Sequence, residues 1–188
     1  MSERVVTFVT GNANKLREAQ QILAAADVPW RLEARAVDVP EVQGTTQEVA
    51  RAKCAAAARA VGGACLTEDT ALCYRALGGL PGPYIKDFLS RLGVDGLARL
   101  AAGFDDKRAF ALCTFAFCAG PDAAPVLFEG TCDGVIVPPR GETAFGWDPV
   151  IEIDGTGKTF AEMSKDEKNS LSHRARALAK VVAFLREH

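Results

Sequence analysis

The sequence predicts a single α/β domain with a mixed β-sheet flanked by helices. Three observations predict it. Short apolar strands alternate with amphipathic helices in the first part of the chain. Two longer apolar strands then follow each other across a turn-forming connection, which indicates an antiparallel hairpin. No internal repeat or linker interrupts the 188 residues, and the pattern leaves the strand order open.

The first part of the chain begins with a run of β-branched and aromatic residues, which predicts a buried strand. Thr10-Gly11-Asn12 breaks this strand, and the apolar residues that follow recur at helical spacing. A second strand stops near Pro40, and an Ala-rich helix ends at two glycines. The elements expected here are a strand at 5–9, a helix from 14 to 26, a strand at 30–37, a helix at 46–60 and a short strand at 64–67.

The second part begins with a Gly- and Pro-rich turn at 78–83. The final helix is expected to start at a capping box formed by Ser164 and Glu167, and to run without a break nearly to His188. The other elements expected are helices at 84–92 and 95–102 and strands at 108–119 and 126–137.

The composition favours a small-molecule ligand over a nucleic acid or a membrane. Nucleic-acid affinity rests mainly on Lys and Arg, and a net charge of −2 with a pI near 5.8 provides no broad basic face. No apolar run approaches the roughly 18 residues of a membrane span, and no signal-peptide pattern is present. Six cysteines without a C-x-x-C pair, and only two histidines, favour reduced and mostly buried thiols in the cytoplasm.

A candidate anion site follows the first strand, in the segment Thr10-Gly11-Asn12-Ala13-Asn14-Lys15. Helix N-termini favour anions because of their free backbone N–H groups and the helix dipole. Gly11 allows a phosphate to approach the backbone, and Lys15 supplies a positive charge. The spacing is not that of a Walker A loop. The alternative is an ordinary strand–helix turn with a surface lysine.

Three acidic residues, Glu41, Glu68 and Asp69, are candidates for holding a divalent cation. Two come directly after a predicted strand, and carboxylates there suit Mg²⁺, which binds a few carboxylates together with phosphate oxygens and water. The alternative is that Glu68 and Asp69 close a turn, with Asp69 bonded to the backbone near Thr70.

Two blocks near the C-terminus are candidates for binding a ligand. In Phe145-Gly146-Trp147-Asp148-Pro149 an aromatic ring can stack on a base and Asp148 can accept from a ring N–H. Lys168-Asn169 and Ser172-His173-Arg174 place two cations and an imidazole on the predicted final helix, where Asn169, His173 and Arg176 would share one face. The alternative for the first block is an aromatic side chain that packs in the core at a turn. The alternative for the second is that its cations extend past a buried apolar stripe to solvent.

Together these blocks resemble the inosine triphosphate pyrophosphatases, also called the Ham1 family, and are nearer to its eukaryotic branch. Bacterial relatives usually carry paired aspartates at the position of Glu68-Asp69, and Ser-Ala-Arg at the position of Ile85-Lys86-Asp87. Six blocks in the order of the family are far more specific than any one of them. The matching blocks are Thr10 to Lys15, Glu68 to Thr70, Leu77 to Lys86, Phe145 to Pro149, Lys158 to Met163, and Glu167 to Asn169 with Ser172 to Arg174.

The resemblance implies hydrolysis of ITP, dITP and XTP between the α- and β-phosphates, which removes deaminated purines from the nucleotide pool. It also implies Mg²⁺, for which Mn²⁺ can substitute, and a homodimer that binds neither nucleic acid nor membrane. The fold implied is one elongated α/β domain spanning 1–188, with a long mixed sheet and two lobes around a nucleotide cleft.

The resemblance also implies roles for individual residues. The segment Thr10 to Lys15, with Lys53 and Lys86, would bind the triphosphate, and Lys15 would also act in catalysis. Glu41 and Asp69 would hold the metal, and Glu68 or Asp69 would orient or deprotonate the attacking water. The residues expected at the base are Phe145, Gly146, Trp147, Asp148, Lys168, His173 and Arg174.

Selectivity for ITP and XTP over ATP would then have a physical basis. Hypoxanthine and xanthine carry a 6-oxo acceptor where adenine carries an amino donor, so donors from His173 or Arg174 would be left unpaired by ATP. GTP shares the 6-oxo group, and its exclusion is expected to depend on a wall against the 2-amino group. Two other functions stay open: a Maf-type pyrophosphatase acting on pyrimidine nucleotides, and a nucleotide sensor without turnover.

Overall fold

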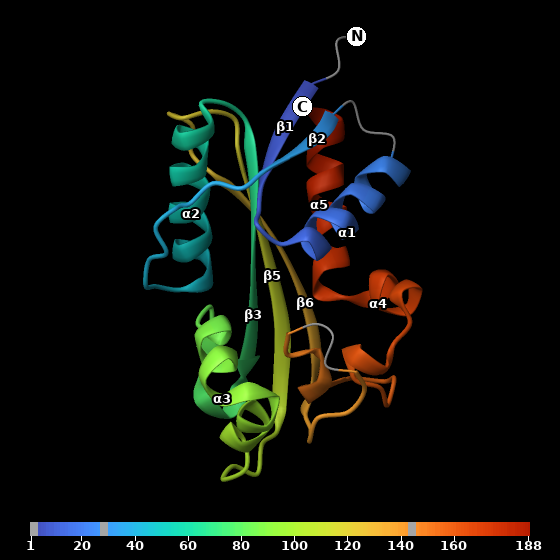
Figure 1. The fold of residues 1–188 in the computed structure, drawn as a ribbon. Coiled ribbons are helices and arrows are strands. Elements are labelled where there is room, and N and C mark those ends of the chain that lie inside the picture. The colour runs from blue at the N-terminus through green and yellow to red at the C-terminus, as the bar shows by residue number, and fades with distance from the viewer. Residues whose placement is uncertain (1–3, 27–29, 143–145) are drawn as a thin grey trace. The chain divides into compact units, whose positions relative to one another are not determined.

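The computed structural model describes residues 4–26, 30–142 and 146–188, which form an α/β fold (Figure 1). The predicted fold class is confirmed. The strands are β1 (Arg4–Val9), β2 (Trp30–Arg35), β3 (Cys65–Tyr74), β4 (Pro81–Gly82), β5 (Arg108–Cys118), β6 (Val126–Ile136) and β7 (Ile151–Ile153). The helices are α1 (Ala13–Ala25), α2 (Thr46–Val61), α3 (Ile85–Leu100), α4 (Lys165–Leu171) and α5 (His173–Glu187), with 3₁₀ helices η1 (Arg75–Leu77), η2 (Asp148–Val150) and η3 (Phe160–Glu162).

The strands form one mixed sheet in the order β2-β1-β3-β5-β6-β7, with β4 beside β3. Strand β1 pairs in parallel with both β2 and β3. Strands β4 and β7 pair antiparallel with β3 and β6. Strands β5 and β6 are neighbours joined by residues 119–125, as the predicted hairpin requires.

The chain divides into two compact units that share strands β3, β5 and β6. The first unit comprises Met1–Asp69, Cys113–Gly130 and Ala175–His188, and the second comprises Thr70–Leu112 and Thr131–Arg174. Each unit has its own apolar core. The candidate residues for the triphosphate and the metal therefore fall mainly in the first unit, and the candidates for the base fall in the second.

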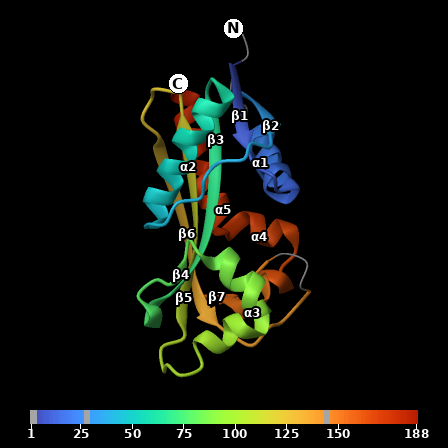
Figure 2. The same cartoon turned by 60° about the vertical axis from the view of Figure 1, so that its left-hand side comes forward.

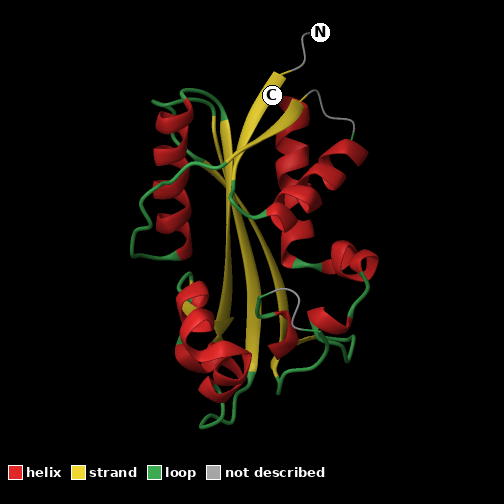
Figure 3. Cartoon of the chain, viewed as in Figure 1, coloured by secondary structure: helices red, strands yellow, loops and turns green. Residues whose placement is uncertain are grey.

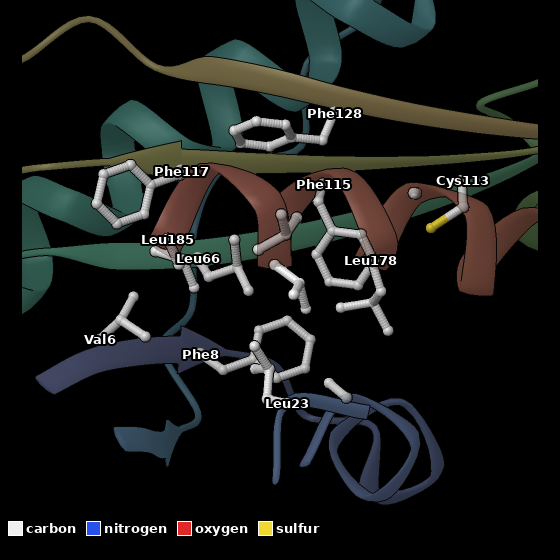
Figure 4. Close-up of a cluster of buried hydrophobic side chains, with 14 residues drawn as sticks. Val6, Phe8, Leu23, Leu66, Cys113, Phe115, Phe117, Phe128, Leu178 and Leu185 are labelled. Atoms are coloured by element: carbon white, nitrogen blue, oxygen red, sulfur yellow. The ribbon is translucent and has the colours of Figure 1, made fainter. Parts of the chain in front are cut away.

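Helices flank the strands of the first unit on both sides (Figures 1 and 3). Helix α2 lies on one side, which the turned view of Figure 2 brings forward, and α1 and α5 lie on the other. On the side of α1 and α5, Phe8, Leu66 and Phe115 pack with Leu178 and Leu185 of α5 (Figure 4). Small Ala and Cys side chains of α2, β3 and β5 fill the opposite side.

The core of the second unit is formed by α3, α4, the three 3₁₀ helices and the remaining strand segments. Trp147 and Phe160 are buried in it together with residues of α3 such as Ile85 and Leu97. Helix α3 contains a non-helical Gly93 with φ of 65°, a conformation that favours glycine. The two short helices predicted here are thus joined end to end.

Helix ends follow their sequence signals. Thr45 caps α2 in a capping box with Glu48, and Gly62 ends that helix in the left-handed conformation. The predicted capping box of Ser164 and Glu167 starts α4. All six cysteines are free and buried, as predicted. No helix in the described ranges is long and apolar enough to cross a membrane.

Two predictions about element boundaries were wrong. Strand β3 does not stop before the acids but continues through Glu68 and Asp69 to Tyr74. The final helix is not continuous, because Ser172 adopts an extended conformation between α4 and α5. His173 is therefore the first residue of a helix and does not share a continuous helical face with Asn169.

Candidate active site

The loop after β1 presents polar residues at the start of α1, as predicted. Asn12 caps this helix, and its Oδ1 accepts hydrogen bonds from the backbone N–H groups of Asn14 (3.0 Å) and Lys15 (3.2 Å). The Thr10 hydroxyl accepts a bond from the backbone N–H of Asn12 (3.1 Å) and still has its own hydrogen to donate. A Cβ at Gly11 would meet no atom within 4 Å, so the backbone there is open to a ligand. An anion can thus contact the open Gly11 backbone, the Thr10 hydroxyl and the Lys15 ammonium.

The acids of β3 lie where β1 ends. The parallel register pairs Phe8 with Leu66, and continuing it places Thr10 beside Glu68. Successive side chains of a strand point to opposite faces of the sheet. Glu68 and Asp69 therefore flank the beginning of the anion loop, one on each face. Ligands of open α/β sheets commonly bind at such carboxyl ends of strands.

Glu68 forms a buried ion pair with the lysine of the anion loop. Lys15 Nζ lies 3.3 Å from Glu68 Oε1, with side-chain exposures of 17% and 0%. The Cys113 thiol on β5 also donates to Glu68 Oε1, with a distance of 3.6 Å between the sulfur and oxygen atoms. A fully buried carboxylate is tolerated when it is paired and hydrogen-bonded. Glu68 thus holds the Lys15 ammonium beside the loop.

Asp69 forms a second ion pair on the opposite face. Lys53 Nζ of α2 donates to Asp69 Oδ1 at 2.6 Å, with side-chain exposures of 21% and 27%. The other carboxylate oxygen, Oδ2, is buried and accepts no hydrogen bond from the residues that the structure describes. A buried oxygen without a donor is costly, so this atom is suited to a cation or a water molecule.

The residues present fit a magnesium ion that is shared with a substrate. Mg²⁺ is usually held by one or two carboxylates together with phosphates and water, and not by a complete protein cage. Across the described ranges, no group of three or more His, Cys, Asp or Glu side chains is placed to hold a metal. Asp69 Oδ2 meets the requirement for one carboxylate oxygen. Glu41, the second predicted ligand, is exposed between β2 and α2, and its role stays a prediction.

In the second unit, Lys86 and Gly146 are exposed. Lys86 lies in the first turn of α3, and Gly146 has a φ of 55°. Trp147 and Asp148 follow in a buried segment at η2. Phe145, predicted to stack on the base, lies outside the described residues.

The His173 imidazole packs against two aromatic rings. Its ring centroid is 5.5 Å from that of Trp147 and 5.5 Å from that of Phe160, with interplanar angles of 35° and 42°. The residue is 2% exposed, and the neighbouring Arg174 is buried to the same extent. An imidazole and a guanidinium in such surroundings act with directional hydrogen bonds and little competition from water.

A buried ion pair lies beside this imidazole. Lys168 Nζ of α4 donates to Asp148 Oδ2, with side-chain exposures of 13% and 7%. The same ammonium is 5.4 Å from the centroid of the Phe160 ring, within the range of a cation–π contact. The predicted base-binding residues Trp147, Asp148, Lys168 and His173 are therefore assembled in one unit.

The block Lys158 to Met163 matched the family but had no predicted role. The Lys158 ammonium donates to Glu167 Oε1 at 2.7 Å, and this bond is the main reason why the pKa of Glu167 is lowered to about 2. Phe160 contacts three of the predicted base-binding residues. A lone Phe in a turn gives no sequence signal that separates such contacts from ordinary core packing.

Sequence and structure comparisons find relatives of nearly the whole chain. Residues 6–184 match the Ham1 family. A relative from Mycosarcoma maydis named inosine triphosphate pyrophosphatase is 61% identical over 98% of this chain and 96% of its own, and one of the same name from Puccinia graminis is 56% identical over 97% and 95%. The structure of a Ham1 protein from Coxiella burnetii is similar with a TM-score of 0.89 and 27% identity, covering 98% of this chain and 100% of its own. This chain therefore belongs to the Ham1 family.

Proposed function

We propose that this protein hydrolyses non-standard purine nucleoside triphosphates, namely ITP, dITP and XTP, to the monophosphate and pyrophosphate. The observation that carries the proposal is the 61% identity, over nearly the whole of both chains, with a relative named inosine triphosphate pyrophosphatase. Two features support the proposal: the ion pairs of the first unit, and the cluster of His173, Trp147 and Phe160 in the second unit, called the imidazole cluster.

The triphosphate is assigned to the first unit. Lys15 and Lys53 are each held by an acid of β3, at 3.3 Å and 2.6 Å, so their ammonium groups stay near the end of β1. Lys86, which is exposed in the second unit, stays a predicted ligand of the triphosphate. Phosphoryl transfer passes through a loose transition state, so positioned positive charge contributes more than proton removal does.

Asp69 and Glu41 are the side chains that would hold Mg²⁺, for which Mn²⁺ can substitute. When bound, the ion would neutralise charge on the triphosphate and polarise the phosphorus that is attacked. Asp69 Oδ2 also has a second lone pair, with which it can orient the attacking water. Glu68 is assigned to positioning Lys15, because its side chain is fully buried in that pair.

The base is assigned to the second unit. A 6-oxo purine presents an acceptor, and Lys168 and Arg174 can only donate. Adenine presents an amino group at the same position, so ATP would leave buried donors unpaired. Discrimination against ATP is then strong, because its binding would leave buried hydrogen-bond donors of the protein without an acceptor.

The same proposal includes a single catalytic domain, a homodimer and a cytoplasmic location. It includes neither a nucleic-acid nor a membrane partner. The net charge of −2 supports a small phosphorylated ligand over a polyanion.

The test is product release from ITP, dITP, XTP, ATP, GTP and dTTP, with Mg²⁺ and with EDTA. We expect pyrophosphate from the first three, slow release from ATP and GTP, and loss of release in EDTA. Preference for dTTP would indicate the Maf-type activity. Orthophosphate as the product would show that a different bond is cut, and ITP binding without turnover would indicate a sensor.

A further inference from the structure

Phe160 is the shared neighbour of the residues proposed to read the base. Its ring packs against His173 at 5.5 Å and Trp147 at 6.4 Å between centroids. The Lys168 ammonium lies 5.4 Å from the same ring while it pairs with Asp148. The ring itself is 2% exposed. An imidazole and an ammonium thus both lie against one buried aromatic ring.

The backbone around Phe160 is fixed by a set of reciprocal hydrogen bonds. Thr159 and Glu162 form a capping box around η3, in which the Thr159 backbone N–H donates to Glu162 Oε2 at 2.8 Å. The buried Thr159 hydroxyl donates to the carbonyl oxygen of Arg140 at 3.0 Å. The Arg140 guanidinium lies 2.6 Å from Glu152 and 3.3 Å from Glu162. The backbone that carries Phe160 is therefore held in place on both sides of the residue.

This support exceeds what a filler of the core requires. An aliphatic side chain can occupy a buried volume, but it has no face of negative electrostatic potential for an ammonium and no flat surface for an imidazole. Recognition of a 6-oxo group requires donors that are held in place before the ligand arrives, because a freely rotating donor loses entropy on binding.

We infer that Phe160 is a positioning residue for base recognition, which holds the His173 imidazole and the Lys168 ammonium in place. The inference rests on the proposed function, since it names a residue that sets affinity and selectivity for 6-oxo purines. Phe160 does not act on the phosphates, so its loss affects binding of ITP and leaves the bond-breaking step unchanged.

The experiment compares Phe160→Leu with Phe160→Tyr and with Phe128→Leu. Phe128 is a buried phenylalanine of the first-unit core. Its ring contacts Phe184, which is not proposed to bind the base. Phe128→Leu therefore removes the same amount of side chain from a core as Phe160→Leu does, but away from the residues proposed to bind the base. In Phe160→Leu we expect KM for ITP to rise about tenfold, or about 1.4 kcal/mol, with kcat changed less than about twofold and a smaller ratio of ITP to ATP turnover. Phe160→Tyr retains the aromatic face and should restore KM.

A second measurement needs no substrate. The chain has two histidines, so imidazole proton signals of His173 and His188 can be assigned by NMR. We expect Phe160→Leu to move the His173 signals and leave those of His188 in place, whereas Phe128→Leu should leave the His173 signals in place. If wild-type protein does not cleave ITP, the proposed function fails, and this spectrum still tests the positioning of His173.

Three results would overturn the inference. The first is an unchanged His173 spectrum in Phe160→Leu. The second is an equal rise in KM for Phe128→Leu, which would indicate a general loss of packing. The third is a fall in kcat at constant KM, which would place Phe160 in the chemical step.

Discussion

The ion pairs of β3 and the imidazole cluster of the second unit differ in the exposure and the surroundings of their charged groups. In the first unit, Lys15 and Lys53 are each held by one acid on opposite faces of a strand, and both side chains keep 17–21% exposure. In the second, the Lys168 side chain is 13% exposed, pairs with Asp148 and lies 5.4 Å from the centroid of the Phe160 ring. Partly exposed cations suit a highly charged ligand that arrives with its own counterions. Donors packed among aromatic rings suit the reading of one polar atom on a flat base.

The same comparison applies within the first unit. The acid paired with Lys15 is fully buried, whereas the acid paired with Lys53 is about one-quarter exposed. Breaking a buried pair leaves an uncompensated charge, and the loss of stability is smaller when the acid is partly exposed to water. Two lysines with similar proposed roles toward phosphate should therefore differ in their contribution to folding.

The largest effect is expected for Asp69→Asn. The amide keeps the shape of the side chain but removes the charge that a metal requires, so kcat/KM for ITP should fall by about 10³, or about 4 kcal/mol. The ratio of ITP to ATP turnover should stay constant. Pyrophosphate release measures both. Asp133→Asn, which alters an exposed pair with Arg75 at 2.9 Å, is the matched control and should retain activity.

Lys15→Met should lower the free energy of unfolding by about 3 kcal/mol, because it leaves the buried Glu68 carboxylate without its cation. Lys53→Met should lower it by less than about 1 kcal/mol. Urea denaturation of the two variants, without nucleotide, measures the difference. Equal losses in the free energy of unfolding would contradict the claim that burial of the acid sets the contribution of each pair.

His173→Phe tests the second unit. Phenylalanine retains the packing against Trp147 and Phe160 but removes the ring nitrogens, so we expect the preference for ITP over ATP to fall by about 10², or about 2.7 kcal/mol. Competition between the two nucleotides measures the ratio directly. An unchanged preference would remove His173 from base recognition.

The smallest effect is expected for Lys158→Met. Its hydrogen bond is the main reason why the pKa of Glu167 lies at about 2, below the ordinary value of 4.5. A carboxyl with a lowered folded-state pKa contributes stability above its ordinary pKa and loses it as the pH falls toward 2. In the variant the pKa of Glu167 should rise, and the loss of stability between pH 4.5 and 2 should be smaller. Carboxyl NMR titration measures the pKa, and KM for ITP at neutral pH should not change.

Local signals in the sequence predicted most elements, because each depends on neighbours along the chain. The capping box at Ser164 and the helix that ends at Gly62 are examples. The extension of β3 was missed because Glu and Asp are poor strand residues, and their compensation by Lys15 and Lys53 is a long-range contact. The break at Ser172 was missed because the apolar spacing continues across it from Leu171 to Ala175.

The candidate site was predicted from the sequence as a set of residue types, but not as a geometry. The motif order identified His173 and Lys168 through resemblance. No pattern indicated that both would contact Phe160, since the residues are separated along the chain and meet only by packing. Strand order was likewise unpredictable, because it depends on hydrogen bonds between distant segments.

The most direct test of the division between phosphate chemistry and base recognition is a double-mutant cycle of Asp69→Asn and His173→Phe, measured as kcat/KM for ITP and for ATP. Independent roles predict that the two losses add in free energy within about 0.5 kcal/mol, and that the double variant has the substrate ratio of His173→Phe alone. A coupling energy above about 1.4 kcal/mol, or a change in that ratio on adding Asp69→Asn, would contradict the account.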